Sequence, residues 1–442
     1  MNTKEGEKTL LFACILALLT VAVMIGLVFF FPSISIKGNF VSTYWFAPVI
    51  AAILIFATGT LSGAEIAEGL TASSGINPLQ LLVLFLSMTL LSVFLDQAGF
   101  FRWLASAVLQ KAGDSQKKLF VCLYVLVSVL TVFTSNDIVI LTFTPFLCCF
   151  AKNAGIDPLP YLVSEFVAAN TWSMALLIGN PTNICLCTAG GVTFLSYLKV
   201  MLLPSVLAGG TTFLVLWLMF RKKLRQPLSH SSEPVEIEDK VAVAAGLLHL
   251  GVCIVLLVFS SFLNLPMWLI TLICFLSLYI LMTARALIRK KGMRVITDSL
   301  RRAPFEIVPF VLSMFILVLA LKKVGATELL ASFLSDGSPL FRFGVTSFFA
   351  ANLVNNIPMS VFYSAVCAAV PASASSAALY ASVAASNLGA YLTPIGALAG
   401  IMWMSLLKRY GVRFTFADFV RNGALVAVPA MAAALLGLWI VL

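Results

Sequence analysis

Four short polar segments interrupt long apolar stretches of this sequence, and their residue types are suited to binding a solute. The first half contains Ser135-Asn136-Asp137 and Gly179-Asn180-Pro181-Thr182-Asn183. The second half contains Asn355-Asn356-Ile357-Pro358 and Ser386-Asn387-Leu388-Gly389, with Thr393-Pro394-Ile395-Gly396 directly after. Gly and Pro free backbone carbonyls, while Asn and Thr bind a cation or a small oxyanion through neutral dipoles. We expect these segments to form a binding site, with a plain proline kink as the alternative for the second segment.

Asp137 is the ionisable residue of these segments. An ionisable group at membrane depth is costly and by default functional. Ser135 and Asn136 are also typical residues for the start of a helix, which favours anions, and apolar Ile138-Val139-Ile140 follow them. We interpret Asp137 as a site for H⁺ or Na⁺, with a neutralised structural role as the alternative. A Na⁺ site would draw on Asn136, Asp137, Asn180 and Asn183.

The predicted substrate- and ion-binding residues are the polar and small members of these segments. They are Ser135, Asn136, Asp137, Gly179, Asn180, Thr182, Asn183, Asn355, Asn356, Ser386, Asn387, Thr393 and Gly396. Four other acids are expected near cytoplasmic helix ends, where a side chain reaches water at little cost, and outside the site. These acids are Asp96, Glu165, Glu306 and Asp418.

No constellation of catalytic residues accompanies the polar segments. His249 is the only histidine within an apolar run, so an intramembrane enzyme lacks its usual partners. The chain has neither a GxxxxGK[ST] loop nor a GxGxxG motif, and its cysteines lack metal-ligand spacing. We therefore expect no enzyme, no catalytic residues, no cofactor and no metal centre beyond the Na⁺ site. The driving force would be an H⁺ or Na⁺ gradient, or a partner ATPase.

The composition places these residues in a membrane. Of 442 residues, 61% are hydrophobic and only 10% charged, and the mean hydropathy is +1.05. A soluble protein carries about 25% charged residues. Apolar runs of about 20 residues, enough for one spanning helix, recur along the whole chain. This pattern excludes a soluble enzyme, a nucleic-acid-binding domain and a single-span receptor.

Ten spans and two re-entrant hairpins are predicted. Full-length apolar runs cover 9–31, 44–61, 80–97, 199–220, 241–260, 266–284, 304–322 and 423–442. Residues 118–190 and 339–407 are apolar but contain the polar segments. Irregular backbone persists in hydrocarbon only where protein encloses it, so these regions should surround a cavity. The predicted fold is an all-α polytopic membrane protein with broken helices.

Matching words in the two halves indicate an internal repeat. Leu86-Ser87-Met88 recurs as Leu312-Ser313-Met314, and Val167-Ala168-Ala169 recurs as Val383-Ala384-Ala385. Each half has five predicted crossings, so the copies should be inverted in the membrane. Positive charges favour the cytoplasm and place both termini outside. The predicted parts are a first repeat at 1–220 (hairpin 118–151, broken span 160–190), a cytoplasmic linker at 221–240, and a second repeat at 241–442 (hairpin 339–370, broken span 377–407).

From about Leu81 onward, the sequence resembles the ArsB/NhaD family of the ion-transporter superfamily. This family includes arsenite exporters, sodium–proton antiporters and citrate-type permeases. The resemblance rests on 94–101 (FLDQAGFF), Asn136-Asp137 with Thr144-Pro145, 302–308 (RAPFEIV), Asn355-Asn356-Ile357-Pro358, and 388–396 with Trp403. It implies a rocking or elevator-like carrier that holds its substrate between hairpin tips and broken spans.

Three positions depart from the arsenite exporters. Those proteins tend to have Asp, Pro and Lys where this chain has Asn387, Ala390 and Tyr391. The segment 179–183 looks more like other anion permeases of the superfamily. Arsenite is therefore one candidate substrate among several.

The leading functional hypothesis is a secondary transporter that exports a small inorganic anion or oxyacid, such as arsenite or antimonite, by alternating access. The alternative is a Na⁺/H⁺ antiporter or a Na⁺-coupled citrate- or dicarboxylate-type anion permease. A sensor or scaffold without transport is a further class, but it would normally carry a soluble output domain. We expect a multi-pass protein of the plasma (inner) membrane, in contact with lipid and not with nucleic acid. A homodimer and a cytosolic ATPase subunit are candidate partners.

Overall fold

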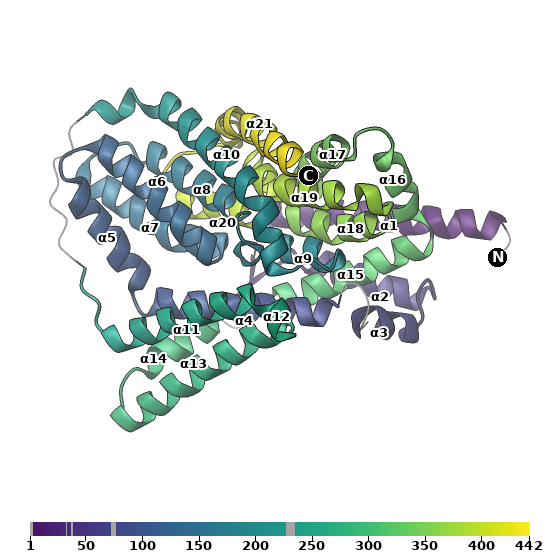
Figure 1. The fold of residues 1–442 in the computed structure, drawn as a ribbon, viewed down its shortest axis with the longest axis horizontal. Coiled ribbons are helices and arrows are strands. Elements are labelled where there is room, and N and C mark those ends of the chain that lie inside the picture. Colours follow the sequence, from purple (N-terminus) through teal and green to yellow (C-terminus); the bar gives the residue numbers. More distant parts are fainter. Residues whose placement is uncertain (1–2, 32, 37–38, 72–76, 227–234) are drawn as a thin grey trace.

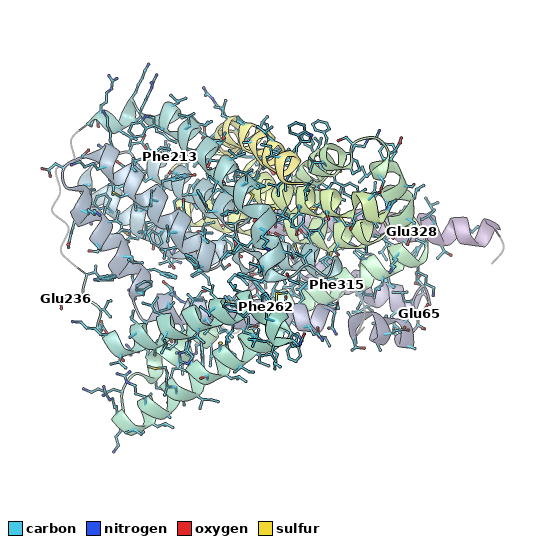
Figure 2. All side chains as sticks on the ribbon, viewed as in Figure 1. Glu65, Phe213, Glu236, Phe262, Phe315 and Glu328 are labelled. Carbon is cyan, nitrogen blue, oxygen red and sulfur yellow. The ribbon has the colours of Figure 1, made fainter. Side chains whose placement is uncertain are left out.

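The computed structural model describes residues 3–31, 33–36, 39–71, 77–226 and 235–442. The described chain is a bundle of helices whose long members run roughly along one direction (Figure 1). Nine helical stretches are long and apolar enough to cross a membrane within this part of the chain. Apolar side chains also cover the outer faces of these helices, where Ile280 is 67% exposed, and Phe262 of a short connecting helix is 73% exposed (Figure 2). Such exposure is costly in water and expected in lipid, so the molecule is an integral, multi-pass membrane protein.

The first half ends with helix α10, and its elements follow in chain order. They are α1 (Thr3–Phe30), β1 (Ser33–Ile36), β2 (Asn39–Ser42), α2 (Phe46–Ala57), α3 (Gly63–Thr71), α4 (Pro78–Gln97), α5 (Phe100–Ala112), α6 (Gln116–Phe133), α7 (Asn136–Ala154), α8 (Leu159–Trp172), η1 (Leu177–Gly179), α9 (Pro181–Ala189) and α10 (Phe194–Phe220).

The second half begins after the short helix η2 (Lys223–Arg225). Its elements are α11 (Lys240–Val258), α12 (Ser260–Leu263), α13 (Met267–Arg289), α14 (Met293–Arg302), α15 (Ile307–Lys323), α16 (Ala326–Ser335), α17 (Pro339–Val354), α18 (Asn356–Ala368), α19 (Ala372–Leu388), η3 (Gly389–Tyr391), η4 (Pro394–Gly396), α20 (Leu398–Arg409) and α21 (Phe416–Val441). Residues 227–234 of the predicted linker lie outside the described residues.

The order of elements from α4 to α10 recurs from α15 to α21. Gly99 before α5 and Gly325 before α16 adopt nearly the same left-handed backbone, with φ of 85° and 82°. Thr193 and Thr415 each form a capping box at the start of the last helix of their half. Figure 1 shows α5 and α16 at opposite ends of the long axis, as expected for inverted copies. Glu236 of the linker lies at the end near α5, and Glu328 of α16 lies at the opposite end (Figure 2).

One prediction needs correction near the N-terminus, where the helical fold also includes a short antiparallel ribbon of β1 and β2 with Ser33 opposite Ser42. The run 44–61 is not one full-length helix, since α2 has 12 residues and a turn at Gly59, with φ of 69°, follows it. Hydropathy measures apolar character and cannot register a turn within an apolar run.

Helix α3 is held to the second half by an ion pair. Lys323, at the end of α15, places its ammonium 2.7 Å from a Glu65 carboxylate oxygen. The hydrogen bond from Lys323, with those from Ser62, lowers the pKa of Glu65 to about 2. Both side chains are partly exposed, so the contribution to stability is small.

The two predicted hairpins differ in length. Helices α6 and α7 have 18 and 19 residues, while α17 and α18 have 16 and 13. At a rise of 1.5 Å per residue, α6 and α7 are each about 27 Å long, close to the thickness of the hydrocarbon core. The first hairpin is therefore longer than a half-depth re-entrant loop requires.

Candidate functional site

The two broken spans meet at a buried cluster of polar side chains. Asn387, at the end of α19, accepts a hydrogen bond from Asn180 Nδ2 at 2.9 Å. Its own Nδ2 donates to Asn183 Oδ1 at 2.7 Å. The Ser173 hydroxyl lies 2.7 Å from Asn387 Oδ1, and the hydroxyls of Thr182 and Ser386 are 3.1 Å apart. All these side chains are at most 2% exposed, so the contact between the halves is polar yet closed to solvent.

Each predicted hairpin adds one asparagine to this cluster. Asn136, the first residue of α7, donates to Asn170 Oδ1 at 3.1 Å. Asn356, the first residue of α18, donates to the Ser386 carbonyl at 3.3 Å. The hairpin tips therefore reach the broken spans from both halves of the chain. We call Asn136, Asn170, Ser173, Asn180, Thr182, Asn183, Asn356, Ser386 and Asn387 the polar cluster.

Asn136 leaves one acceptor of the polar cluster unused. Its Oδ1 atom is buried and has no hydrogen-bond partner among the described residues, and the side chain is 2% exposed. A buried acceptor without a donor is destabilising unless a ligand or water satisfies it. This oxygen can accept a bond from a solute hydroxyl or coordinate a cation.

The remaining predicted residues support the second broken span. Asn355 adopts φ of 75°, accepts from the Ile357 backbone and donates to the Ile395 carbonyl at 2.9 Å. Thr393 donates through both its backbone and its hydroxyl to Asn352 Oδ1. Ser135 is the buried residue before α7, and its side chain makes no capping bond there. These contacts position the tip of α17–α18 and the backbone of η4.

The two predicted glycines allow the broken spans to fold back on themselves. A Cβ atom on Gly179 would lie 2.3 Å from the Ser173 carbonyl oxygen. A Cβ atom on Gly396 would lie 2.7 Å from the Gly389 carbonyl oxygen. Each break thus needs a residue without a side chain, at equivalent places in the two repeats.

Asp137 makes no hydrogen bond to the other residues of its predicted Na⁺ site. Its side chain is half-buried and makes no hydrogen bond or ion pair among the described residues. Asp137 and Glu306 both act electrostatically on Tyr44, just before α2. The amides of Asn180 and Asn183 are instead engaged with Asn387. Asn136 and Asp137 are therefore adjacent on one helix tip, but only Asn136 takes part in the hydrogen bonds of the polar cluster.

All four of the other acids make structural contacts, and Glu165 accepts a hydrogen bond from the Thr144 hydroxyl. Asp96 lies 3.2 Å from Arg302 and accepts from Thr142, Glu306 accepts from the Ser42 backbone, and Asp418 caps α21. Glu165 differs from the prediction, because it is 1% exposed and cannot reach water. Helices pack on every side of α8, so a position near its start gives no access to solvent.

Sequence reasoning missed several residues of the site. Asn170 and Ser173 join the polar cluster, and Thr171 lies 3.2 Å from the Tyr391 hydroxyl. A signal for Asn170 was present, because it directly follows Val167-Ala168-Ala169. The matching word at 383–385 is followed directly by Ser386 and Asn387.

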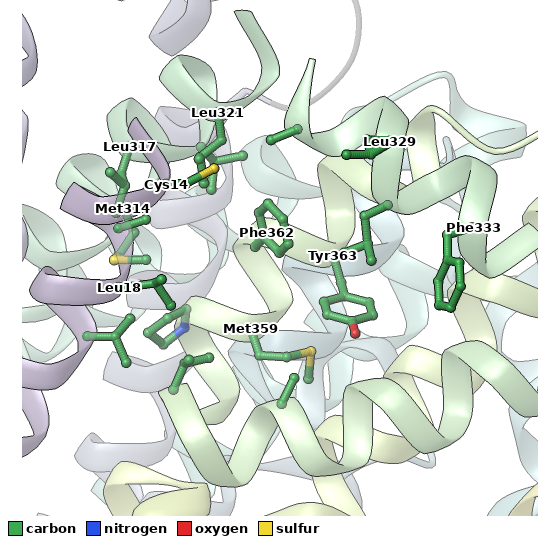
Figure 3. A pocket seen from close by; sticks show the side chains of 18 of the residues that line it. Cys14, Leu18, Met314, Leu317, Leu321, Leu329, Phe333, Met359, Phe362 and Tyr363 are labelled. Carbon is green, nitrogen blue, oxygen red and sulfur yellow. The ribbon is translucent and has the colours of Figure 1, made fainter. Parts of the chain in front are cut away.

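A large apolar cavity lies on another side of α18. It has a volume of about 1030 Å³ and is lined by α1, α15, α16, α17 and α18. Figure 3 shows Leu18, Met314, Met359 and Phe362 among its walls. A hydrated anion finds few polar groups here, so this cavity is not the solute site.

Comparison with known proteins identifies the family. The profile of the citrate transporter family, CitMHS, matches residues 10–385. The chain belongs to the citrate transporter family. The predicted resemblance to ArsB/NhaD-type ion transporters is thereby confirmed. The protein is therefore a multi-pass secondary transporter of anions.

Curated relatives agree with this assignment, and one solved structure shares the fold. The arsenical pump membrane protein of Escherichia coli K12 is 27% identical over 78% of this chain and 83% of its own. The putative arsenical pump membrane protein of Bacillus subtilis is 25% identical, covering 86% and 90%. The YdaH transporter of Alcanivorax borkumensis has the same overall fold, with a TM-score of 0.55, 14% identity and 98% of both chains covered.

Proposed function

We propose that this protein exports a small inorganic oxyacid of the arsenite or antimonite type, driven by an ion gradient. The chemistry of the polar cluster carries the proposal. Its side chains are amides and hydroxyls, and no Lys, Arg or His of the described chain takes part in its hydrogen bonds. A multiply charged carboxylate would need cationic partners at this depth. A neutral oxyacid needs hydrogen bonds alone, and its hydroxyls match the free Asn136 Oδ1.

Transport in everted membrane vesicles tests this function. Vesicles with the protein should accumulate arsenite when a proton gradient is imposed, and a protonophore should abolish the accumulation. Vesicles without the protein provide the control. Accumulation of citrate instead of arsenite, at several pH values, would overturn the proposed substrate. The similarity to arsenical pump membrane proteins supports this choice of probe.

A Na⁺/H⁺ antiporter or a Na⁺-coupled anion permease is the second candidate, and Asp137 favours it. A half-buried carboxylate without a cation partner among the described residues, one position from the free Asn136 Oδ1, offers the oxygen ligands that hard cations prefer. Asp137→Asn should abolish transport that depends on Na⁺ and leave expression intact, with the exposed Asp114→Asn as control. Full Na⁺-dependent flux in Asp137→Asn would remove Asp137 from this role. A homodimer and an ATPase subunit stay predictions.

A further inference from the structure

Glu165 is a buried carboxyl group that the polar cluster does not use. It lies on α8, is 1% exposed, and places both carboxyl oxygens 3.0 Å from the Thr144 hydroxyl of α7. No Lys, Arg or His nitrogen of the described residues lies within ion-pair distance of it. Its neighbours are therefore neutral donors: the Thr144 hydroxyl and the Trp403 indole of α20.

This geometry is satisfied by the protonated form of the carboxyl. The Thr144 hydroxyl and the Trp403 indole each have a single proton to donate and carry no charge, so an ionised carboxylate would keep an uncompensated charge. A neutral acid can donate its proton to Thr144 Oγ1 while Thr144 donates to the other oxygen. Each of the two 3.0 Å distances between Thr144 Oγ1 and the carboxyl oxygens then corresponds to a hydrogen bond, and no charge is buried.

The neighbouring helices supply no buried positive charge that would stabilise the ionised form of Glu165. The Cys148 thiol of α7 lies within electrostatic range of the carboxyl, and the Trp403 ring of α20 packs on Phe166 at a centroid distance of 5.0 Å. The Tyr161 hydroxyl, one turn earlier on α8, donates to Gln116 of α6. Asp418 caps α21, and Asp137 is half-buried in the first turn of α7. The other charged side chains on the surrounding helices are exposed: Lys117, Lys118, Lys152, Lys199, Lys408, Arg409 and Arg421.

We propose that Glu165, paired with Thr144, is a proton-binding site that couples proton movement to opening of the polar cluster. The pair joins the same two helices as the Asn136–Asn170 bond at 3.1 Å. A movement of α7 away from α8 would break both contacts, expose Glu165 to water and release its proton. Protonation of Glu165 and entry of a solute at Asn136 therefore favour opposite states of this helix contact, as exchange of a proton for the solute requires. This inference rests on the proposed function for the role of the proton.

Infrared difference spectroscopy tests the proton site without any substrate. The purified protein should show the C=O stretch of a protonated carboxylic acid at neutral pH, and Glu165→Gln should lack it. Glu65→Gln, which alters an exposed acid, and Asp137→Asn should both retain it. Persistence of the band in Glu165→Gln overturns the proposal. If Glu165→Gln does not fold, Thr144→Val should shift the band because the acid loses its partner, and an unshifted band overturns the proposal.

Arsenite transport in proteoliposomes separates coupling from binding. Glu165→Gln mimics the neutral acid but cannot release a proton. It should therefore lose proton-driven accumulation by at least about tenfold and retain exchange at equal pH on both sides. Proton-driven accumulation equal to that of the unaltered protein would overturn the proposal. If the unaltered protein does not transport arsenite, the proposed substrate fails, while the infrared result still decides whether Glu165 binds a proton.

Discussion

At the scale of single residues, Asn387 joins the two halves of the molecule. Its amide accepts from Asn180, lies beside the Ser173 hydroxyl and donates to Asn183, all on the first broken span. A buried amide with every group paired both rigidifies its site and specifies one arrangement of its partners. Arsenite exporters tend to have Asp where this chain has Asn387, so this difference affects the central residue of the polar cluster.

Asn387→Ala should abolish arsenite transport and lower the free energy of unfolding by about 1–3 kcal/mol, because buried donors and acceptors lose their partner. Thermal melting in detergent measures the second effect. Asn422→Ala is the matched control, because Asn422 donates one bond to the Asp418 carbonyl of its own helix, outside the cluster. Unchanged transport in Asn387→Ala would contradict a central role for this amide.

At the scale of elements, the site depends on close packing of α10 against the end of α8. A Cβ atom on Gly209 would lie 2.4 Å from the Trp172 ring, directly before the break in the span. The Gly209 carbonyl also accepts a hydrogen bond from the Tyr124 hydroxyl at 2.7 Å. The next residue, Gly210, has nothing within 4 Å of its Cβ position. Two adjacent glycines therefore have different roles.

Gly209→Ala should lower the melting temperature and impair transport, because the added methyl group displaces Trp172 and the backbone of the break. The expected cost is about 1–3 kcal/mol. Gly210→Ala should be neutral or slightly stabilising, since alanine favours a helix over glycine. Equal melting temperatures for the two variants would show that α8 can move at no cost.

At the scale of the whole molecule, the repeat produces two ends of similar construction. Asp114 lies between α5 and α6, and Asp336 lies at the equivalent place between α16 and α17, and both are exposed. The loop charges predict that the first is cytoplasmic and the second external. The positions of α5 and α16 at opposite ends of Figure 1 fit that arrangement.

Labelling of single cysteines in intact cells tests the inversion. With the nine native cysteines replaced, Asp336→Cys should react with an impermeant maleimide from outside, and Asp114→Cys should react only after the membrane is opened. Each variant is the control for the other. Reaction of both variants from the same side would contradict inverted repeats.

Sequence alone determined the class of the protein and where its helices break. Apolar composition reports burial in lipid directly, and Gly, Pro and Asn act on the backbone locally, so Asn180, Asn183 and Asn387 could be selected without coordinates. Their role in binding stays a prediction. The family resemblance also depends on short words of sequence, and comparison with known proteins confirmed it.

Only the tertiary structure decided which side chains meet. Asn387 and Asn183 are 204 residues apart in the chain, and no local pattern encodes such a pairing. Helix α8 is buried on all sides, so it has no polar face whose periodicity could set Glu165 or Asn170 apart from its other residues. Glu165 meets Thr144 because α7 and α8 pack together, and that packing depends on the shape of the whole bundle.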